Sequence, residues 1–376
     1  MERILLLVKK FIPPEIFRAL QPGYHFLLAF IAALVYFFPS RKLKVIGVTG
    51  TDGKSSVVEL LHEILRGAGA KVASASSLRF KLNEKEEPNM LKMTMPGRFF
   101  MQSFLKQAAK SGAEYVVLEV TSEGIKQFRH KFIKFDAAVL TNVTPEHIEA
   151  HGSFEKYRKA KAKLFSSLGK NCVAILNRDD PSWGFFAGHT KAKINFYREN
   201  YLVIAGREYP VSNLSYQNEI RFSVGGVDFY SLLFGKFNVS NILAAVAAAH
   251  SLGVPLQKIA EALKNISGIP GRLEIIQREP FRVVVDYAHT PNALKSVYKV
   301  LKEAFPGSRL VCVLGAAGGG RDKWKRPELG KIAGEFCGEI IVTNEDPYDE
   351  PPEDIIDEVA AGVGRRVQKT LDRPEA

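Results

Sequence analysis

The sequence predicts an α/β protein in which helices pack against mainly parallel β-sheets, and three observations predict this class. Short runs of β-branched and aliphatic residues, typical of buried strands, occur at 44–49, 116–120, 137–140 and 173–176. Segments with apolar residues at helical spacing separate them, at 56–67, 99–109 and 154–168. A glycine-rich turn follows the first strand, and a second series of strands and helices begins beyond residue 271. Strands that alternate with helices indicate βαβ units and therefore parallel sheets.

The composition is that of a globular protein. The chain has 376 residues, which at about 150 residues per domain suggests two to three domains. Hydrophobic residues make up 46% and charged residues 24%, which excludes a disordered or collagen-like chain. Lys and Arg total 52 against 40 Asp and Glu, and the formal charge of +12 suits nucleic acid, anionic lipid or phosphorylated ligands. Because Cys172, Cys312 and Cys337 have no C-x-x-C spacing, we expect buried free thiols in a reducing cytoplasm rather than a zinc ribbon or disulfides.

Residues 1–40 form an apolar N-terminal segment that we expect to be helical. Its apolar run, 24–38, is shorter than the roughly 20 residues that a helix needs to span a bilayer. No small-residue cleavage site follows, so a signal peptide is not expected. Two interpretations remain: a helix that covers the next domain, or an interfacial anchor. The second is favoured by basic residues on the flanks, Lys9, Lys10, Arg41, Lys42 and Lys44.

The rest of the chain divides into two units. The first, 41–267, continues with short alternating strands between 194 and 234 and an Ala-rich helix at 238–252. The Gly- and Pro-containing run 268–271 is the best hinge, so the second unit is 268–376. Its expected strands are 283–286, 310–314 and 340–343, and its expected helices are 293–304 and 328–336. This pattern is typical of a smaller Rossmann-like domain, which we expect to be C-terminally truncated because the chain holds barely three of its strands.

The strongest motif is the glycine-rich loop between the first strand and helix. In such loops, backbone N–H groups and the helix N-terminus bind phosphate oxygens, a Lys reaches the β- and γ-phosphates, and a Ser hydroxyl can bind Mg²⁺. Here Lys54 and Ser55 stand at those positions, although Val48 replaces the first glycine of the standard spacing. The central domain is therefore predicted to be of the P-loop type. Its predicted ATP-binding residues are Gly50, Thr51, Asp52, Gly53, Lys54, Ser55 and Ser56.

This loop, T-G-T-D-G-K-S-S, resembles the ATP loop of the Mur ligases, the ATP-dependent amino-acid ligases of peptidoglycan synthesis, and of their folylpolyglutamate synthetase relatives. Further segments resemble the family in the family's order, several of them its tripeptide synthetase branch. They are 118–124, 141–147, 157–165, 235–245, 271–274, 285–294 and 316–327.

The resemblance implies a metal site, with Ser55 as one ligand. Glu119 matches a Mg²⁺-binding glutamate, and His147 a histidine that helps hold a second metal. Lys161 matches a lysine that CO₂ carbamylates, which would supply anionic oxygens for two Mg²⁺ beside a triphosphate. Only a neutral amine reacts with CO₂, so a crowded cationic setting that lowers the Lys161 pKa would help. Without the resemblance, 157–165 would be interpreted as a solvated basic helix.

The resemblance also implies nucleotide contacts. Asn238 and Asn241 lie in the segment that closes over adenine and share a helix face, although Asn238 could instead be an N-cap. Arg272 matches a hinge arginine that reaches the ATP phosphates when the domains close. Asp286 fits a ribose contact, and His289 lies toward the phosphates. The implied catalytic residues are Lys54, Glu119, His147, Lys161 and Arg272.

Implied substrate contacts lie elsewhere in the chain. Thr94 and Met95 match a segment that touches the muramyl peptide, with Met95 as a departure from the family. Thr121, Gln127 and Arg129 fall at further peptide- and sugar-contacting positions. The basic stretch 126–134 suits an anionic UDP-linked substrate, with a solvated basic face as the alternative.

The segment 345–348 bears on which amino acid is added. The family's diaminopimelate enzymes carry D-N-P-R, whose Arg grips the distal carboxylate. Here the corresponding residues are Glu345, Asp346, Pro347 and Tyr348, so that arginine is missing. Acidic residues suit an amino group, which favours lysine or ornithine over diaminopimelate.

Taken together, the resemblance implies an ATP-dependent ligase that adds a free amino acid to a UDP-N-acetylmuramoyl peptide through an acyl phosphate. The implied cofactors are ATP, two Mg²⁺ and a carbamate on Lys161. We expect a cytoplasmic monomer that binds no nucleic acid. If the segment 24–38 is an interfacial anchor, it contacts the inner face of the membrane. Family members usually carry a UDP-binding domain before the ATP loop, where this sequence has only residues 1–44. UDP recognition is then lost, or supplied by that segment, a partner or a membrane-associated substrate.

Three alternative functions stay open. The first is a related ligase that acts on folate or another substrate, against which D-Y-A-H-T-P at 286–291 argues, because folate enzymes typically have D-G-A-H-N-P. The second is a non-catalytic nucleotide-binding protein. The third is a nucleic-acid-binding protein, suggested by the charge.

Overall fold

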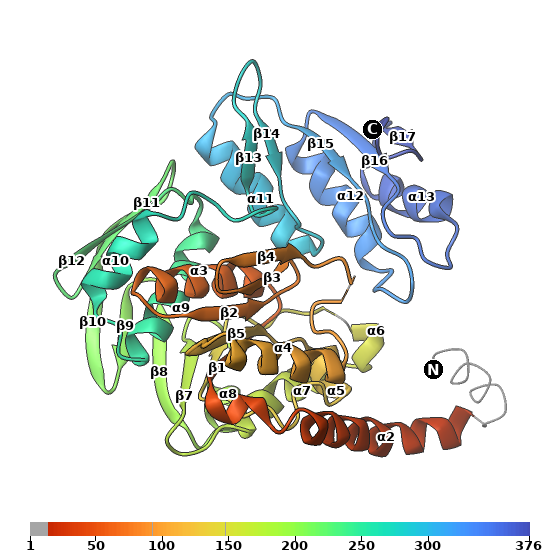
Figure 1. The fold of residues 1–376 in the computed structure, drawn as a ribbon. Helices are drawn as coiled ribbons and strands as arrows, with labels where there is room; N and C mark the ends of the chain where they lie inside the picture. Colours follow the sequence, from red (N-terminus) through yellow and green to blue (C-terminus); the bar gives the residue numbers. More distant parts are fainter. Residues whose placement is uncertain (1–13, 92, 147) are drawn as a thin grey trace.

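The computed structural model describes residues 14–91, 93–146 and 148–376 and confirms the α/β class (Figure 1). The larger unit contains a twelve-stranded sheet. Its strands are β1 (Lys44–Thr49), β2 (Val72–Ala75), β3 (Arg79–Leu82), β4 (Lys85–Pro88), β5 (Tyr115–Glu119), β6 (Ala137–Leu140), β7 (Val173–Asn177), β8 (Lys193–Arg198), β9 (Tyr201–Ile204), β10 (Arg207–Ser215), β11 (Ile220–Val224) and β12 (Val227–Ser231).

The strand order is β12-β11-β10-β9-β8-β7-β6-β1-β5-β2-β3-β4. The central strands from β8 to β2 are all parallel, whereas antiparallel strands extend the sheet at both ends. Central parallel strands are buried on both faces, which is why they read as continuous apolar runs in the sequence. The last strand at one end, β4, has only exposed residues.

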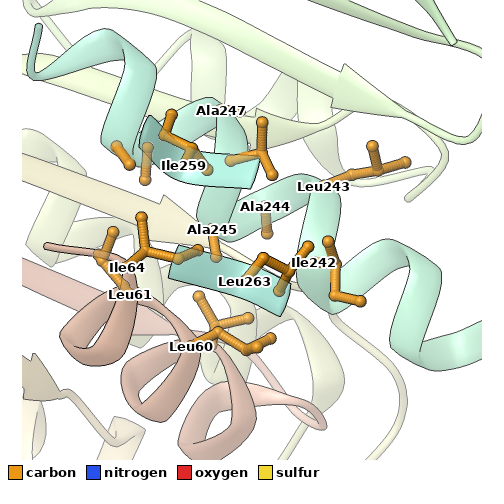
Figure 2. Packing of buried hydrophobic residues seen from close by; sticks show 14 of the residues in the cluster. Leu60, Leu61, Ile64, Ile242, Leu243, Ala244, Ala245, Ala247, Ile259 and Leu263 are labelled. Atoms are coloured by element: carbon orange, nitrogen blue, oxygen red, sulfur yellow. The ribbon is translucent and has the colours of Figure 1, made fainter. Parts of the chain in front are cut away.

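Helices cover both faces of this sheet. On one face lie α3 (Lys54–Gly67), α9 (Lys236–Ser251) and α10 (Leu256–Lys264), which share an apolar core with alternate residues of the strands. Figure 2 shows Leu60, Leu61 and Ile64 of α3 beside the alanine-rich α9 and Leu263 of α10. The other face is covered by α4 (Arg98–Lys110), α7 (Phe154–Ser166) and α8 (Trp183–Ala187). Two short helices, α5 (Ser122–Lys126) and α6 (Ile148–His151), follow β5 and β6.

The second unit follows α10 and has its own core. Its parallel sheet has the order β15-β16-β17, formed by β15 (Val311–Leu314), β16 (Glu339–Thr343) and β17 (Gln368–Thr370). It packs with α11 (Pro291–Ala304), α12 (Lys325–Phe336) and α13 (Pro352–Gly362). The expected strand 283–286 becomes β14 (Val283–Val285), which pairs antiparallel with β13 (Glu274–Gln277), a strand that the sequence analysis missed. The boundary that we expect at residues 267 and 268 falls between α10 and β13.

The N-terminal segment is helical, as expected, but its helix is longer than the apolar run. Helix α2 spans Pro14–Val35 with Pro22 inside it, and a 3-10 turn, η1 (Pro39–Lys42), follows. The helix ends before Phe37 and Phe38, whose φ angles of 61° and 51° cannot continue it. In Figure 1, α2 runs along the edge of the larger unit, where it contacts α4. No helix in the described ranges is long and apolar enough to cross a membrane.

The three cysteines are free thiols. Cys312 and Cys337 are buried as expected, whereas Cys172 is only partly buried.

Candidate active site

The loop between β1 and α3 is compact because two of its residues lack side chains. Gly50 has a φ of 155°, and a Cβ atom there would lie 1.8 Å from Thr141 Oγ1. Gly53 has a φ of 79°, and a Cβ atom there would lie 2.3 Å from Asn241 Oδ1. Residues with side chains rarely adopt such conformations. Glycine is therefore required at both positions for the loop to lie against the end of β6 and the start of α9.

Residues that follow β6 hold this loop. Asn142 accepts the backbone N–H of Thr51 through its carbonyl at 2.8 Å and that of Asp52 through Oδ1 at 2.9 Å. Thr141 Oγ1 donates to the Asp52 carbonyl at 2.7 Å, and the Tyr157 hydroxyl lies 3.1 Å from Thr51 Oγ1. Sequence reasoning placed Thr141, Asn142 and Tyr157 in family-like segments but assigned no role to them.

The loop lysine is held beside a carboxylate. Lys54 Nζ donates to the Thr51 carbonyl at 2.6 Å and lies 3.9 Å from Glu119 Oε1. Ser55 and Ser56 are buried in the first turn of α3, where backbone N–H groups have no partner within the helix. Such a helix start favours bound anions, so the loop combines the N–H donors of the first turn of α3 with the positive charge of Lys54.

Glu119 ends β5 and gathers hydroxyl groups around one carboxylate oxygen. Its Oε2 accepts the Ser55 hydroxyl at 2.9 Å, the Ser77 backbone N–H at 2.9 Å and the Ser77 hydroxyl at 3.2 Å. Parallel strands bring these groups together, because the loops after β1, β2 and β5 leave the same edge of the sheet. Ser77 was missed in the sequence, since no motif contains it.

Lys161 lies inside the protein rather than on a solvated face. It is 2% exposed, its Nζ donates to the Gly50 carbonyl at 2.6 Å, and it sits 4.4 Å from the Tyr157 ring centroid. Burial, and then the charge of Lys54, lower the pKa of Lys161 well below its ordinary value. The basic-helix interpretation is therefore wrong for Lys161, whereas Lys159 and Lys163 on the same helix are exposed.

The donor chemistry at this edge fits Mg²⁺, which prefers carboxylate and other oxygen ligands. Glu119 and Ser55 are in contact, and Lys161 borders the same loop, but His147 lies outside the described residues. Within the described ranges, no three His, Cys, Asp or Glu side chains form a metal-binding group. A histidine that sequence reasoning missed does reach this region: His151 Nε2 lies 3.1 Å from Ser122 Oγ.

Two residues of the second unit reach the loop. Arg272 Nη2 donates to Ser55 Oγ at 3.3 Å, and its guanidinium lies 5.0 Å from the Tyr287 ring centroid. Thr290 Oγ1 donates to Asp52 Oδ1 at 3.3 Å. Burial raises the pKa of Asp52, while the nearby Lys54 opposes this shift. The predicted hinge arginine is thus brought to the loop, together with a threonine that was not predicted.

Two further predicted nucleotide residues are engaged by backbone groups. Asp286 accepts the N–H groups of Leu273 and Ala288, each at 2.7 Å, and burial raises its pKa. His289 is exposed, and its Nδ1 lies 3.0 Å from the Tyr287 carbonyl oxygen. Asp286 therefore shapes the turn after β14 in this structure.

A cavity of about 550 Å³ opens between the two units. Its lining includes Asn238 of α9, the hinge residues 267–270 and Arg272. Asn238 does not cap α9, because Gly235 occupies the N-cap position; it donates to the Phe234 carbonyl at 3.0 Å and accepts from Asn241 Nδ2 at 3.1 Å. The N-cap interpretation is wrong, and the two amides do act together. The cavity lies at the hinge, and Arg272 in its lining also contacts Ser55 of the loop.

The junction between the units is also held at the segment after β6. Asp322 accepts the backbone N–H groups of Ile148 and Glu149 at 3.3 and 3.0 Å. Lys323 donates its backbone N–H to Glu149 Oε1 at 3.0 Å. The segment 316–327 therefore anchors the part of the chain that contains position 147.

The predicted acceptor residues form a separate cluster beyond Glu119. Thr121 caps α5 by accepting the Gly124 N–H at 3.0 Å, and the buried Met95 packs on Gly124. Arg129 donates to the Met95 carbonyl and, at 2.7 Å, to Gln127 Oε1. Thr94 beside them is half-buried. These five residues are brought together, and the loop that carries Thr121 connects them to the end of β5.

The predicted amino-acid residues lie in the loop after β16. The carbonyl of Asp346 accepts the Gly318 N–H at 3.0 Å, and the exposed Tyr348 covers Gly319. Glu345 is half-buried, and its charge adds to burial in raising the pKa of Tyr287. This loop faces the 315–320 loop at the carboxyl edge of the small sheet.

Comparison with known proteins gives two adjacent family matches. The description "Mur ligase middle domain" matches residues 48–249, and "Mur ligase, glutamate ligase domain" matches residues 271–376. A UDP-N-acetylmuramyl-tripeptide synthetase of Roseiflexus sp. (strain RS-1) is 37% identical over 370 residues, which covers 93% of this chain and 72% of the relative. A UDP-N-acetylmuramoyl-L-alanyl-D-glutamate--2,6-diaminopimelate ligase of Halalkalibacterium halodurans is 36% identical over 355 residues, with the same coverage of 93% and 72%.

Solved structures agree with these matches. A UDP-N-acetylmuramoyl-L-alanyl-D-glutamate--2,6-diaminopimelate ligase, 31% identical, superposes with a TM-score of 0.61 over 89% of this chain and 69% of that protein. A folylpolyglutamate synthase of Mycobacterium tuberculosis superposes with a TM-score of 0.73 over 95% and 90%, but at 17% identity this likeness concerns the fold alone.

Proposed function

This chain belongs to the Mur ligase family of ATP-dependent, ADP-forming ligases of peptidoglycan synthesis, and we propose that it adds an amino acid to a muramyl peptide. The acceptor of the Roseiflexus and Halalkalibacterium relatives is, by their names, a UDP-N-acetylmuramoyl peptide. We propose the same muramyl peptide chemistry here. The observation that carries the proposal is the meeting of Lys54, Glu119 and the buried Lys161 around one glycine-rich loop.

The proposed reaction has two steps. The acceptor carboxylate attacks the γ-phosphate of ATP, which forms an acyl phosphate and releases ADP. The neutral amine of the amino acid then attacks the acyl carbon, and the tetrahedral intermediate collapses with loss of phosphate and a proton. Phosphoryl transfer of this kind depends mainly on positioning and on neutralising charge. Lys54 and Arg272 supply that positive charge from the two sides of the cleft.

Ser55, Glu119 and a carbamylated Lys161 are the proposed holders of two Mg²⁺ ions, with His147 as the further candidate. When bound, Mg²⁺ would neutralise charge on the phosphates. The lowered pKa of Lys161 supports carbamate formation, because it raises the fraction of neutral amine, the form that reacts with CO₂. The short hydrogen bond from Lys161 to Gly50 holds the reactive nitrogen at the loop.

For nucleotide binding, we propose that ATP spans the loop residues 50–56 and the cavity lined by Asn238. Asn241 would orient the Asn238 amide, while Asp286 would meet the ribose and His289 the phosphates. The cavity volume of about 550 Å³ supports a ligand of nucleotide size.

The amino acid is proposed to bind at the loop that contains Glu345, Asp346 and Tyr348. A carboxylate-gripping arginine is replaced by Tyr348, and an acidic pair suits a second amino group. We therefore propose a lysine-like amino acid in preference to diaminopimelate, which the Halalkalibacterium relative uses by its name.

The protein is proposed to act as a cytoplasmic monomer that touches the inner face of the membrane through residues 24–38. Exposed apolar side chains in this run, including Phe37 at 80% exposure, support the contact.

The experiment that tests the function is amino-acid-dependent ADP release with UDP-muramyl-dipeptide and a panel of amino acids. We expect turnover that requires Mg²⁺ and is greatest with lysine or ornithine. Lys161→Ala is expected to lose this turnover, whereas Lys163→Ala on the exposed side of the same helix keeps it. Absence of amino-acid-dependent ADP release with any muramyl peptide would overturn the proposal.

A further inference from the structure

Helix α2 carries an apolar face that is exposed in the structure. Between residues 19 and 40 the sequence has no Asp, Glu, Lys or Arg. The exposed side chains recur at helical spacing and form one stripe: Leu20, Tyr24, Leu27, Ile31, Leu34 and Val35, each 37–61% exposed. The opposite side of the helix is buried at Ala29, Ala32 and Ala33. A helix that is apolar all round normally lies in an apolar environment, so water is an unfavourable partner for this stripe.

Basic side chains border the carboxyl end of this stripe. Lys106 Nζ lies 5.7 and 5.4 Å from the ring centroids of Tyr36 and Phe37, and the Arg41 guanidinium lies 4.6 Å from the Phe38 centroid. Lys42 is exposed next to them. An apolar stripe with cations along its border is the pattern of a helix that lies in the headgroup region of an anionic bilayer.

The buried side of α2 contacts the predicted acceptor cluster. His25 Nδ1 lies 2.5 Å from Arg98 Nη2, and Arg98 donates to the Gln127 carbonyl at 2.6 and 3.1 Å. Gln127 in turn accepts from Arg129. Burial, and then the charges of Arg98 and Arg129, lower the pKa of His25 to about 4, so His25 is neutral at pH 7 and accepts from Arg98. Two hydrogen bonds therefore connect helix α2 to Gln127.

Aromatic contacts fix the helix at this place. The Phe26 ring lies 6.0 Å from that of Phe128 and 5.3 Å from that of Phe132, and Phe30 lies 5.5 Å from Phe132. Phe128 and Phe132 have φ angles of 57° and 61°, which bulky residues rarely adopt. The turn that carries Gln127 and Arg129 is thus shaped around α2.

Arg98 and Arg129 have the character of a diphosphate site. Both are half-buried, and neither forms an ion pair with a carboxylate in the described part of the chain. Among the described residues, Arg129 Nε is buried without a hydrogen-bond partner. A diphosphate links the sugar to its carrier both in a UDP-linked and in a lipid-linked muramyl peptide. Beyond the arginines, the neighbouring surface is apolar: Arg129 contacts Met93 at 3.6 Å, and the exposed stripe of α2 follows.

We propose that the muramyl peptide acceptor is carried on a membrane lipid, and that α2 holds the active site against the bilayer from which this acceptor is taken. The inference rests on the proposed function and names the carrier of its acceptor. The diphosphate binds Arg98 and Arg129, and the lipid chain stays in the bilayer beside the stripe. A uridine nucleotide would require polar groups where α2 presents Leu, Ile and Phe side chains.

The test compares three acceptors that carry the same muramyl peptide: one linked by a diphosphate to an isoprenoid in phosphatidylglycerol–phosphatidylcholine vesicles, one linked to UDP, and one without a carrier. We expect kcat/KM for the lipid-linked acceptor to exceed that for the UDP-linked acceptor by at least about ten-fold. Vesicle flotation is expected to weaken in pure phosphatidylcholine and in high salt.

The stripe variant is the double substitution Leu27→Glu/Leu34→Glu, at residues that are 55% and 53% exposed. The matched control is Val311→Glu/Leu371→Glu on the second unit, at residues that are 50% and 48% exposed. The stripe variant should lose flotation and at least about ten-fold in kcat/KM on the lipid-linked acceptor, yet keep turnover of the carrier-free one. The control variant should keep both vesicle flotation and kcat/KM on the lipid-linked acceptor.

Three results would overturn the inference. Equal or better use of the UDP-linked acceptor would overturn the lipid carrier and leave the ligase function standing. An unchanged stripe variant would overturn the membrane role of α2, also without affecting the ligase function. Absence of amino-acid-dependent ADP release with all three acceptors would overturn both proposals.

Discussion

Lys325 Nζ lies 2.9 Å from Glu146 Oε1, and both side chains are buried although they come from different units of the chain. Burial raises the pKa of Glu146, and Lys325 is the main opposing influence. The pair joins α12 to the segment after β6, one residue before the predicted metal-site position 147. It therefore joins the two units at a second place besides the hinge.

Removing one member of this pair should open the junction. In Lys325→Met, Glu146 keeps a buried charge without a partner, which typically costs about 3–5 kcal/mol. We expect a lower unfolding temperature and a larger radius of gyration by X-ray scattering. The stability deficit of Lys325→Met should shrink from pH 8 to pH 5. A Glu whose pKa is raised in the folded state takes up a proton there more readily than in the unfolded chain, so the folded state gains stability as pH falls. Lys325→Met/Glu146→Gln should recover most of the loss, and a single variant as stable as the parent would contradict this role.

A more exposed contact supplies the control. Lys323→Met breaks a contact with Glu350 in which the lysine is 57% and the glutamate 18% exposed, and Glu350 keeps its contact with Arg326. Because the charge of Glu350 stays paired, unfolding temperature and scattering should hardly change.

Glycine at position 50 is required by space as well as by conformation. Gly50→Ala would place a Cβ atom 1.8 Å from Thr141 Oγ1, so the loop must move. We expect a loss of stability of about 2–4 kcal/mol and no measurable nucleotide binding by calorimetry. Gly184→Ala, in a helix where a Cβ atom meets nothing within 4 Å, should instead gain up to about 1 kcal/mol. Normal nucleotide affinity in Gly50→Ala would contradict the loop assignment.

Activity should depend on dissolved CO₂. Burial lowers the pKa of Lys161 and so favours the neutral amine that forms a carbamate. If the proposed carbamate is needed for turnover, degassed, bicarbonate-free enzyme should lose activity and recover it when bicarbonate is added. Lys161→Ala should lose about a hundred- to a thousand-fold in kcat, in the range seen when one charge-stabilising group is removed. Lys163→Ala provides the matched control on α7. Full activity of the wild type without CO₂ would contradict carbamate formation.

The attachment of α2 should weaken in acid. The pKa of His25 is lowered to about 4 in the folded protein, against 6.5 for an ordinary histidine, so the unfolded chain binds the additional proton between these values. The stabilising effect of neutral His25 is complete above pH 6.5 and is lost as pH falls toward 4. In a pH series of unfolding temperatures, His25→Gln should flatten the decline over that window. The exposed His189→Gln should leave the curve unchanged, and equal curves for all three proteins would contradict the prediction.

The sequence predicted the elements with local signals. The parallel strands were evident as apolar runs, and Lys54, Ser55 and Lys161 stood in contiguous motifs. Ser77 could not be found in this way, because its contact with Glu119 joins residues 42 positions apart. Lys325 and Glu146 are 179 positions apart, and nothing in the sequence around either residue indicates that the two charges are paired. Such contacts arise from topology, which brings loop ends to one sheet edge.

Short exposed elements were also difficult to predict from the sequence. Strand β13 is only half-buried, so its residues show neither alternation nor a continuous apolar run. For α2, the apolar composition left two interpretations open. The structure supports parts of both, because one side of the helix covers α4 while the other carries the exposed stripe.

The outermost strand of the large sheet has a consequence for solution behaviour. Strand β4 reads Lys-Glu-Glu-Pro, and its outer edge has no neighbouring strand in the described sheet. An unpaired edge can recruit a strand from another molecule and begin aggregation. Three charged side chains and a proline, which lacks the N–H donor, make such recruitment unfavourable. A chain that concentrates on a membrane surface would thus stay dispersed there as far as this edge is concerned, because β4 resists pairing with a second copy.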